Sequence, residues 1–140
     1  MKTFTILIAN WLVDGCELRL IREIVFINEQ QVPVELEWDE FDYSCIHVLA
    51  VSDGKPIGTA RCLTNGHIGR MAVLREWREK GVGSALLHRL LEEIKSQRMQ
   101  QATLNAQIGA VGFYRKSGFQ VAGKEFMEAG IPHVKMILQL

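Results

Sequence analysis

The sequence has few of the features that mark secreted or membrane proteins. Its three cysteines, Cys16, Cys45 and Cys62, are odd in number and widely spaced, so we expect reduced, buried thiols rather than a disulfide framework. No apolar run approaches the about 18 residues that a membrane-spanning helix needs. The apolar start MKTFTILIAN is too short for a secretory signal peptide with its cleavage site. These absences predict a cytoplasmic protein without a membrane partner.

Net charge is also absent. Sixteen Lys and Arg residues balance sixteen Asp and Glu residues. A general polyanion binder needs an excess of positive charge, so we predict no nucleic-acid partner, and any anion site must be local. The four histidines and three cysteines show no zinc-type spacing, so no metal is expected. The chain is 48% hydrophobic and long enough for a sizeable core, which predicts one folded domain over residues 1–140.

The residue pattern predicts the element order β-α-β-β-β-α-β-α-β-β. Helical spacing of apolar residues indicates a helix over 15–27, capped by Asp14 in a capping-box pattern with Glu17. Asp53-Gly54 and Asn65-Gly66 are hairpin-turn signals. They separate three expected strands, over 46–51, 57–63 and 67–74.

The second half continues this pattern. An amphipathic helix is expected over 82–97, then a strand over 102–107 and a short helix closed by Gly118, before a final strand pair. A strand, a crossover helix and another strand form a parallel pair. The predicted fold class is therefore α+β (mixed α/β), with a mostly antiparallel sheet.

Residues 29–44 have no clear period, and the stretch ELEWDEFD within them carries five acids. We expect a long loop with at most a helical turn. Long loops of this kind are usually functional or disordered, and Trp38 argues against disorder. The acids either select a cationic substrate or form a solvated surface.

Two glycines begin the predicted helix over 82–97, in the stretch REKGVGS. A helix start exposes unpaired backbone N–H groups with partial positive charge, and phosphates bind there. Gly81 and Gly83 leave that backbone accessible, and Ser84, Arg78 and Lys80 add a hydroxyl and positive charge. Neither a Walker loop nor a Rossmann fingerprint fits this string. The stretch therefore predicts a pyrophosphate-binding loop.

The residues from Arg78 to Gly83 resemble the Gln/Arg-x-x-Gly-x-Gly/Ala signature of the GNAT superfamily of N-acetyltransferases. LNAQIGAVGFYRKSGF is similar to that family's later asparagine strand and tyrosine helix. The flanking segments resemble a small bacterial subgroup of poorly defined substrate. The resemblance implies a GNAT-type sheet with a splayed parallel strand pair, flanked by helices. It also implies acetyl-CoA as co-substrate.

The resemblance further implies which residues contact acetyl-CoA. Backbone groups of the strand before the loop meet the pantetheine arm, the loop holds the pyrophosphate, and Tyr114 acts as general acid toward the departing thiolate. The implied set is Met71, Ala72, Val73, Arg78, Glu79, Lys80, Gly81, Val82, Gly83, Ser84, Asn105, Phe113 and Tyr114.

The general base is left open among Glu29, Glu37, His47 and His133, with His133 and Glu37 as the catalytic candidates beside Tyr114. A structural role is favoured for His47, and two further histidines, His67 and His88, are expected to be solvated.

Glu29 and Trp38 are candidate substrate-binding residues, whereas Arg22 would suit an anionic substrate group. The expected acceptor is a small-molecule or peptide amine, and a polyamine, an amino sugar, another small amine and a protein amine all stay open.

Two other functions remain open: a non-catalytic acyl-CoA sensor, and a protein-interaction module on the same fold. A homodimer is also compatible with the apolar C-terminal stretch VKMILQL.

Overall fold

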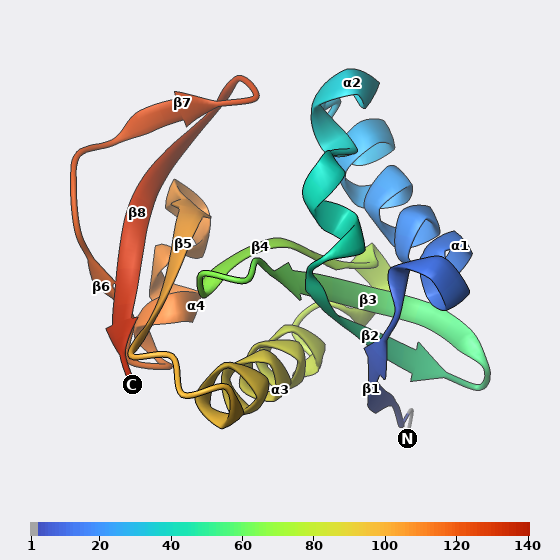
Figure 1. Ribbon diagram of the computed structural model, residues 1–140. Helices are drawn as coiled ribbons and strands as arrows, with labels where there is room; N and C mark the ends of the chain where they lie inside the picture. Colours follow the sequence, from blue (N-terminus) through green and yellow to red (C-terminus); the bar gives the residue numbers. More distant parts are fainter. Residues whose placement is uncertain (1–2) are drawn as a thin grey trace.

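The computed structural model describes residues 3–140. Within them, eight strands form one sheet in the order β1-β2-β3-β4-β5-β8-β6, with β7 paired to β8 (Figure 1). The strands are β1 (Thr5–Ala9), β2 (Ile46–Ser52), β3 (Lys55–Cys62), β4 (His67–Val73), β5 (Gln101–Gln107), β6 (Gln120–Val121), β7 (Phe126–Glu128) and β8 (Ile131–Gln139). The expected order of elements is confirmed, except that β7 was not predicted.

Helices cover both faces of the sheet. The α-helices are α1 (Trp11–Arg22), α2 (Val34–Glu37), α3 (Val82–Ser96) and α4 (Val111–Arg115). Leu86, Leu87 and Leu90 of α3 are fully buried in the main core, as the helical period predicts. Ile21 of α1 and Val25, just beyond it, pack on the opposite face of the sheet against Ala72. The α+β class is confirmed.

The strands β4 and β5 run parallel and separate almost at once. Their pairing is confined to His67 opposite Thr103 and Ile68 opposite Leu104. All the other neighbouring strands in the sheet are antiparallel. In Figure 1 the β5–β8 half of the sheet turns away from the β1–β4 half above this junction. The sheet therefore has the splayed parallel pair that the family resemblance implied.

A bulge in β4 accompanies the separation. Thr59 pairs with Ala72 and Arg61 with Gly69, so β4 carries one more residue than β3 between these pairs. Arg70 lies in this bulge with φ of 49°, a left-handed conformation that is unusual for a residue with a side chain. Side chains of β4 change faces across it. Ile68 packs into the main core, whereas Ala72 packs toward α1.

The first helix begins earlier than predicted. Asn10 caps α1, since its side chain accepts hydrogen bonds from the backbone N–H groups of Leu12 and Val13 at 2.8 and 3.2 Å. Asp14 lies inside the helix and accepts from the backbone N–H of Asn10, so the prediction that it caps the helix was wrong. Gly15 was mistaken for a helix start, but it is a buried position within α1.

The helix also continues further than predicted. Residues Glu23–Glu29 extend α1 as π-helix, and the backbone N–H of Gln30 closes it by donating to the carbonyl of Val25 at 3.0 Å. Wide turns of this kind are rare and occur often at functional sites. The following residues are not one open loop, because they form α2 and a 3₁₀-helix, Glu40–Tyr43.

The three cysteines are free, but they differ in exposure. Cys62 is buried and Cys45 is half-buried, whereas Cys16 is exposed, so the expectation of three buried thiols was wrong for Cys16. In residues 3–140 no helix has the length and apolarity that crossing a membrane requires.

Candidate active site

A cavity of about 470 Å³ opens where β4 and β5 separate. Its lining comes from both halves of the sheet and from the segment between α1 and α2. It includes five of the residues predicted from the sequence: Glu37, Met71, Asn105, Tyr114 and His133. Apolar side chains of Phe26, Val32, Leu36, Leu63 and Ile131 form much of the remaining wall. The cavity is therefore the candidate active site.

The glycine-rich loop lies at the start of α3, between β4 and the helix. Gly81 has φ of 86°, and no side chain caps the helix. The first backbone N–H groups of α3 have no partner within the helix and are available to an anion. A Cβ atom at Gly83 would lie 3.3 Å from the ring of Phe113, so the loop packs closely on α4. This arrangement fits the pyrophosphate of a coenzyme A thioester.

Arg78 fixes the loop to its surroundings. Its Nε donates to the carbonyl of Val73 at 2.9 Å, and Nη1 and Nη2 donate to the carboxylate of Glu29 at 2.7 and 2.8 Å. The Arg78 hydrogen bond holds the pKa of Glu29 below its usual value. Glu29 therefore lies against the loop rather than in the cavity lining. Lys80 places its ammonium 5.8 Å from the centre of the Trp77 ring.

Tyr114 extends from α4 toward β4, across the gap between β4 and β5. Its hydroxyl lies 3.8 Å from Sδ of Met71, on the far side of the splay from β5. Burial raises the pKa of Tyr114 to about 12. The phenol therefore stays protonated at neutral pH, which keeps it a hydrogen-bond donor.

His133 and Glu128 lie together in the lining of the same cavity. Nδ1 of His133 lies 2.7 Å from the carbonyl of Ile131, so we assign the ring proton to Nδ1. The other nitrogen, Nε2, lies 3.5 Å from the carboxylate of Glu128. Asn105 approaches the same carboxylate at 3.5 Å. A basic nitrogen and a half-exposed carboxylate thus face one part of the cavity.

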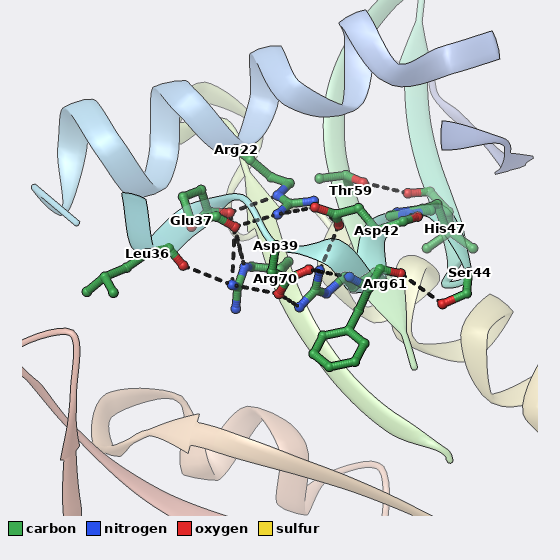
Figure 2. Close-up of polar contacts among 12 residues, drawn as sticks. Arg22, Leu36, Glu37, Asp39, Asp42, Ser44, His47, Thr59, Arg61 and Arg70 are labelled. Atoms are coloured by element: carbon green, nitrogen blue, oxygen red, sulfur yellow. Dashed lines mark hydrogen bonds and ion pairs between the residues drawn. The ribbon is translucent and has the colours of Figure 1, made fainter. Parts of the chain in front are cut away.

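Three arginines and three acids form a buried network beside the cavity (Figure 2). Arg22 donates to Glu37 at 2.8 Å and to Asp42 at 2.7 Å, and Arg61 donates to Asp42 at 2.7 Å. Asp39 accepts from Arg61 at 2.6 Å. Burial alone would raise the pKa of Asp42, but hydrogen bonds from Arg22 and Arg61 outweigh it and lower that pKa. The acids are therefore neither solvated nor free.

This network corrects two expectations. Arg22 does not meet a substrate anion, because it is 1% exposed and its donors bind Glu37 and Asp42. Glu37 lines the cavity, but Arg22 and Arg70 hold its carboxylate, and burial raises its pKa. Of the base candidates, His133 also lines the cavity, and its Nε2 has no arginine partner within residues 3–140 and faces the carboxylate of Glu128.

Trp38 and His47 lie away from the cavity lining. Trp38 packs beside the cluster of Trp11, Leu18 and Leu49, with its ring 5.0 Å from the guanidinium carbon of Arg22. His47 is 1% exposed, and its Nε2 lies 2.8 Å from the carbonyl of Asp42. The structural role favoured for His47 is confirmed.

His67 was expected to be solvated, which was wrong. Nδ1 of His67 lies 2.8 Å from the hydroxyl of Thr103 on β5, and His67 lines the cavity. Burial lowers the pKa of His67, which favours the neutral ring. This contact depends on β5, which the crossover helix α3 brings next to β4. The sequence around His67 therefore could not predict it. His88 is exposed as expected.

No group of three or more His, Cys, Asp or Glu side chains able to hold a metal ion occurs within residues 3–140.

Comparison with known proteins decides the family. The description of the acetyltransferase (GNAT) domain matches residues 25–140. This chain belongs to the GNAT family. GNAT proteins transfer acyl groups, so the protein is an acyltransferase.

Individual relatives agree with this assignment. The N-acetyltransferase YjcF of Bacillus subtilis, itself uncharacterised, is 38% identical over 121 residues, which span 84% of this chain and 86% of YjcF. The crystal structure of Escherichia coli ElaA has a TM-score of 0.84 with 26% identity and covers 98% of this chain and 99% of its own. An acyl-CoA N-acyltransferase from Pseudomonas aeruginosa has a TM-score of 0.85 with 25% identity, over 96% and 99% of the two chains.

Proposed function

We propose that this GNAT protein transfers the acetyl group of acetyl-CoA to a primary amine, by direct attack within a ternary complex. One observation carries the proposal. The cavity at the β4–β5 separation is lined both by a hydrogen-bond donor, the hydroxyl of Tyr114, and by a ring nitrogen, Nε2 of His133. Acyl transfer needs a donor for the departing thiolate and an acceptor for the proton of the amine.

The strand separation supports a site for the thioester. Beyond Ile68, β4 has no strand partner on its β5 side among residues 3–140, so its backbone groups can pair with the amides of pantetheine. The proposal places the pantetheine arm along Met71, Ala72 and Val73, and gives Asn105 the facing contacts. The backbone at Gly81–Ser84 takes the pyrophosphate, supported by the positive end of α3.

The chemical step then follows from these positions. The amine lone pair attacks the thioester carbonyl carbon, so that the C–N bond forms and the C–S bond breaks. Nε2 of His133 takes a proton from the amine, and the carboxylate of Glu128 stabilises the imidazolium that results. The thiolate leaves with its charge stabilised by the O–H of Tyr114. The products are an N-acetyl amine and coenzyme A.

A thiol-release assay tests the proposal. The protein is incubated with acetyl-CoA and a panel of amines that includes amino acids, polyamines, amino sugars and peptides, beside a control without amine. Amine-dependent release of free thiol is the expected result. A thermal shift with acetyl-CoA but no release with any amine would instead indicate a non-catalytic acyl-CoA sensor. Absence of both effects would leave a protein-interaction module and refute the proposal.

A further inference from the structure

Arg70 differs from the other two arginines of the buried network. Arg22 and Arg61 are 1% and 6% exposed. Each has carboxylate contacts of 2.8 Å or less, although Nη2 of Arg22 also lies 3.3 Å from Asp42. The contacts of Arg70 are longer, from 3.2 to 3.4 Å, and they use only Nε and Nη2. Nη1 of Arg70 has no partner among the described residues. A guanidinium with spare donors therefore lines the cavity.

The backbone presents this side chain at a cost. Arg70 has φ of 49° in the bulge of β4, a left-handed conformation that is unfavourable for a residue with a Cβ. Bulges re-aim side chains, and strained residues cluster at ligand sites. In Figure 2 the outer nitrogen of Arg70 points away from the other five charged side chains of the network. The bulge thus turns one donor of Arg70 out of the network.

Opposite charges line two sides of the same cavity. Arg70 comes from β4, whereas Glu128 and His133 come from β7 and β8, across the strand separation. The carboxylate of Glu37 is already held by arginines, which leaves Glu128 as the half-exposed acid of the lining. A small acceptor that carries both a carboxylate and an amine matches these charges, with its carboxylate toward Arg70 and its amine toward Glu128. A simple amine or a polyamine would leave the donor of Arg70 without a partner.

Part of the cavity wall is apolar. It includes Phe26 of the π-helix, Leu36 of α2 and Val32 from the segment between them. An apolar side chain on the acceptor would be buried there.

From these contacts we infer that the acceptor is an α-amino acid with an apolar side chain. Its carboxylate accepts hydrogen bonds from Nη1 of Arg70, and its amine faces Nε2 of His133 and the carboxylate of Glu128. Arg70 is thus a specificity-determining residue. This inference rests on the proposed acetyltransferase function, since it names the acceptor of that reaction.

The test compares leucine with leucinamide, which has the same shape but a neutral amide in place of the carboxylate. Thiol release from acetyl-CoA should give a kcat/KM at least tenfold higher for leucine than for leucinamide. In Arg70→Met the value for leucine should fall at least tenfold, while that for leucinamide changes less than threefold. Arg89→Met, which removes an arginine from the outer face of α3, should leave both values unchanged.

Other outcomes overturn the inference. A wild-type protein that uses leucinamide as well as leucine, or that releases thiol only with polyamines or amino sugars, refutes it and leaves the acetyltransferase intact. An equal fall in kcat/KM for leucine and for leucinamide in Arg70→Met also refutes it. No release with any acceptor refutes the acetyltransferase itself. Because the wild-type comparison is decisive alone, the test holds even where Arg70→Met fails to fold.

Discussion

The carboxylate of Glu29 receives two hydrogen bonds from the guanidinium of Arg78, at 2.7 and 2.8 Å. The bridge joins the last residue of the π-helix to the glycine loop before α3. It therefore ties the segment that lines the acceptor side of the cavity to the loop proposed to hold the pyrophosphate. Arg78 acts in this account by fixing the loop, because its donors are used by Glu29 and by the carbonyl of Val73.

Weakening this bridge should weaken acetyl-CoA binding. An ion pair with this exposure contributes about 0.2–1 kcal/mol, so Glu29→Gln should raise the Kd for acetyl-CoA by up to about fivefold. Isothermal titration at low and high salt measures this, and the difference from wild type should shrink at high salt. Glu23→Gln, an exposed position on the same π-helix without an ion pair, serves as the control. An identical Kd for all three proteins at low salt would show that the bridge does not fix the loop.

Asp42 should be the most sensitive acid of the buried network. Arg22 and Arg61 both donate to it, and it is 1% exposed. Asp42→Asn removes the charge that both guanidinium groups face, which typically destabilises a protein by about 3–5 kcal/mol. Urea unfolding measures the loss. Glu40→Gln, an exposed acid in the same 3₁₀-helix, should lower the unfolding free energy by less than about 0.5 kcal/mol. Equal stabilities of the two variants would contradict the network.

Gly66 should tolerate no side chain. Its φ is 88°, and a Cβ atom there would lie 2.7 Å from the carbonyl oxygen of Gln101, at the start of β5. Gly54 provides a matched comparison, because its φ is 74° but nothing lies within 4 Å of its Cβ position. Gly54→Ala should cost about 1 kcal/mol from backbone strain, and Gly66→Ala about 1–3 kcal/mol more from the clash. Thermal unfolding of the two variants measures the difference, and a smaller loss for Gly66→Ala would be inconsistent with this packing.

Tyr114 should affect turnover more than binding. Removing its hydroxyl deprives the thiolate of its donor, so Tyr114→Phe should lower kcat by about a hundredfold or more with little change in the Kd for acetyl-CoA. Tyr43→Phe, at a tyrosine that is 67% exposed, is the control and should keep wild-type turnover. If Tyr114→Phe turned over at the wild-type rate, Tyr114 would have no part in the chemistry.

The pH dependence gives a second readout of Tyr114. Burial raises its pKa to about 12, whereas an exposed phenol ionises near pH 10. The phenol of Tyr114 therefore keeps its proton, and can donate a hydrogen bond, at pH values below that raised pKa. Turnover should show no loss from phenol ionisation up to about pH 10. A steady-state pH profile of kcat measures this. A fall in wild-type kcat near pH 10 that is missing from Tyr114→Phe would show that the phenol ionises there.

Local patterns predicted the parts of the fold that depend on neighbours in sequence. The predictions of α3 and of the Asn65-Gly66 turn were correct, because the spacing of apolar residues and the left-handed conformation of glycine depend on only a few neighbouring residues. The start of α1 was missed because Gly15 looked like a boundary, while the cap came from Asn10. The sequence left open whether the acids of residues 29–44 bind a cationic substrate or are solvated. The arginine partners of Asp39 and Asp42 were not foreseen, because Arg61, for example, lies about twenty residues away along the chain.

The candidate site was predictable only in part. The glycine loop has a local motif, whereas the cavity exists because β4 and β5 separate after two residue pairs. Its lining therefore combines residues such as His67 and Glu128 that no short pattern connects. The left-handed backbone at Arg70 also had no signal in the sequence, since that conformation is usual for glycine and not for arginine.

The central claim is that the acetyl group passes from a thioester to an amine in this cavity. Nuclear magnetic resonance with acetyl-CoA labelled with ¹³C at the carbonyl carbon tests it most directly, in the presence of leucine and the other amines of the panel. The account predicts that the thioester signal disappears while an amide signal of equal size grows, and that Tyr114→Phe slows both changes. A thioester signal that persists with every amine, or that is replaced by free acetate, would contradict it.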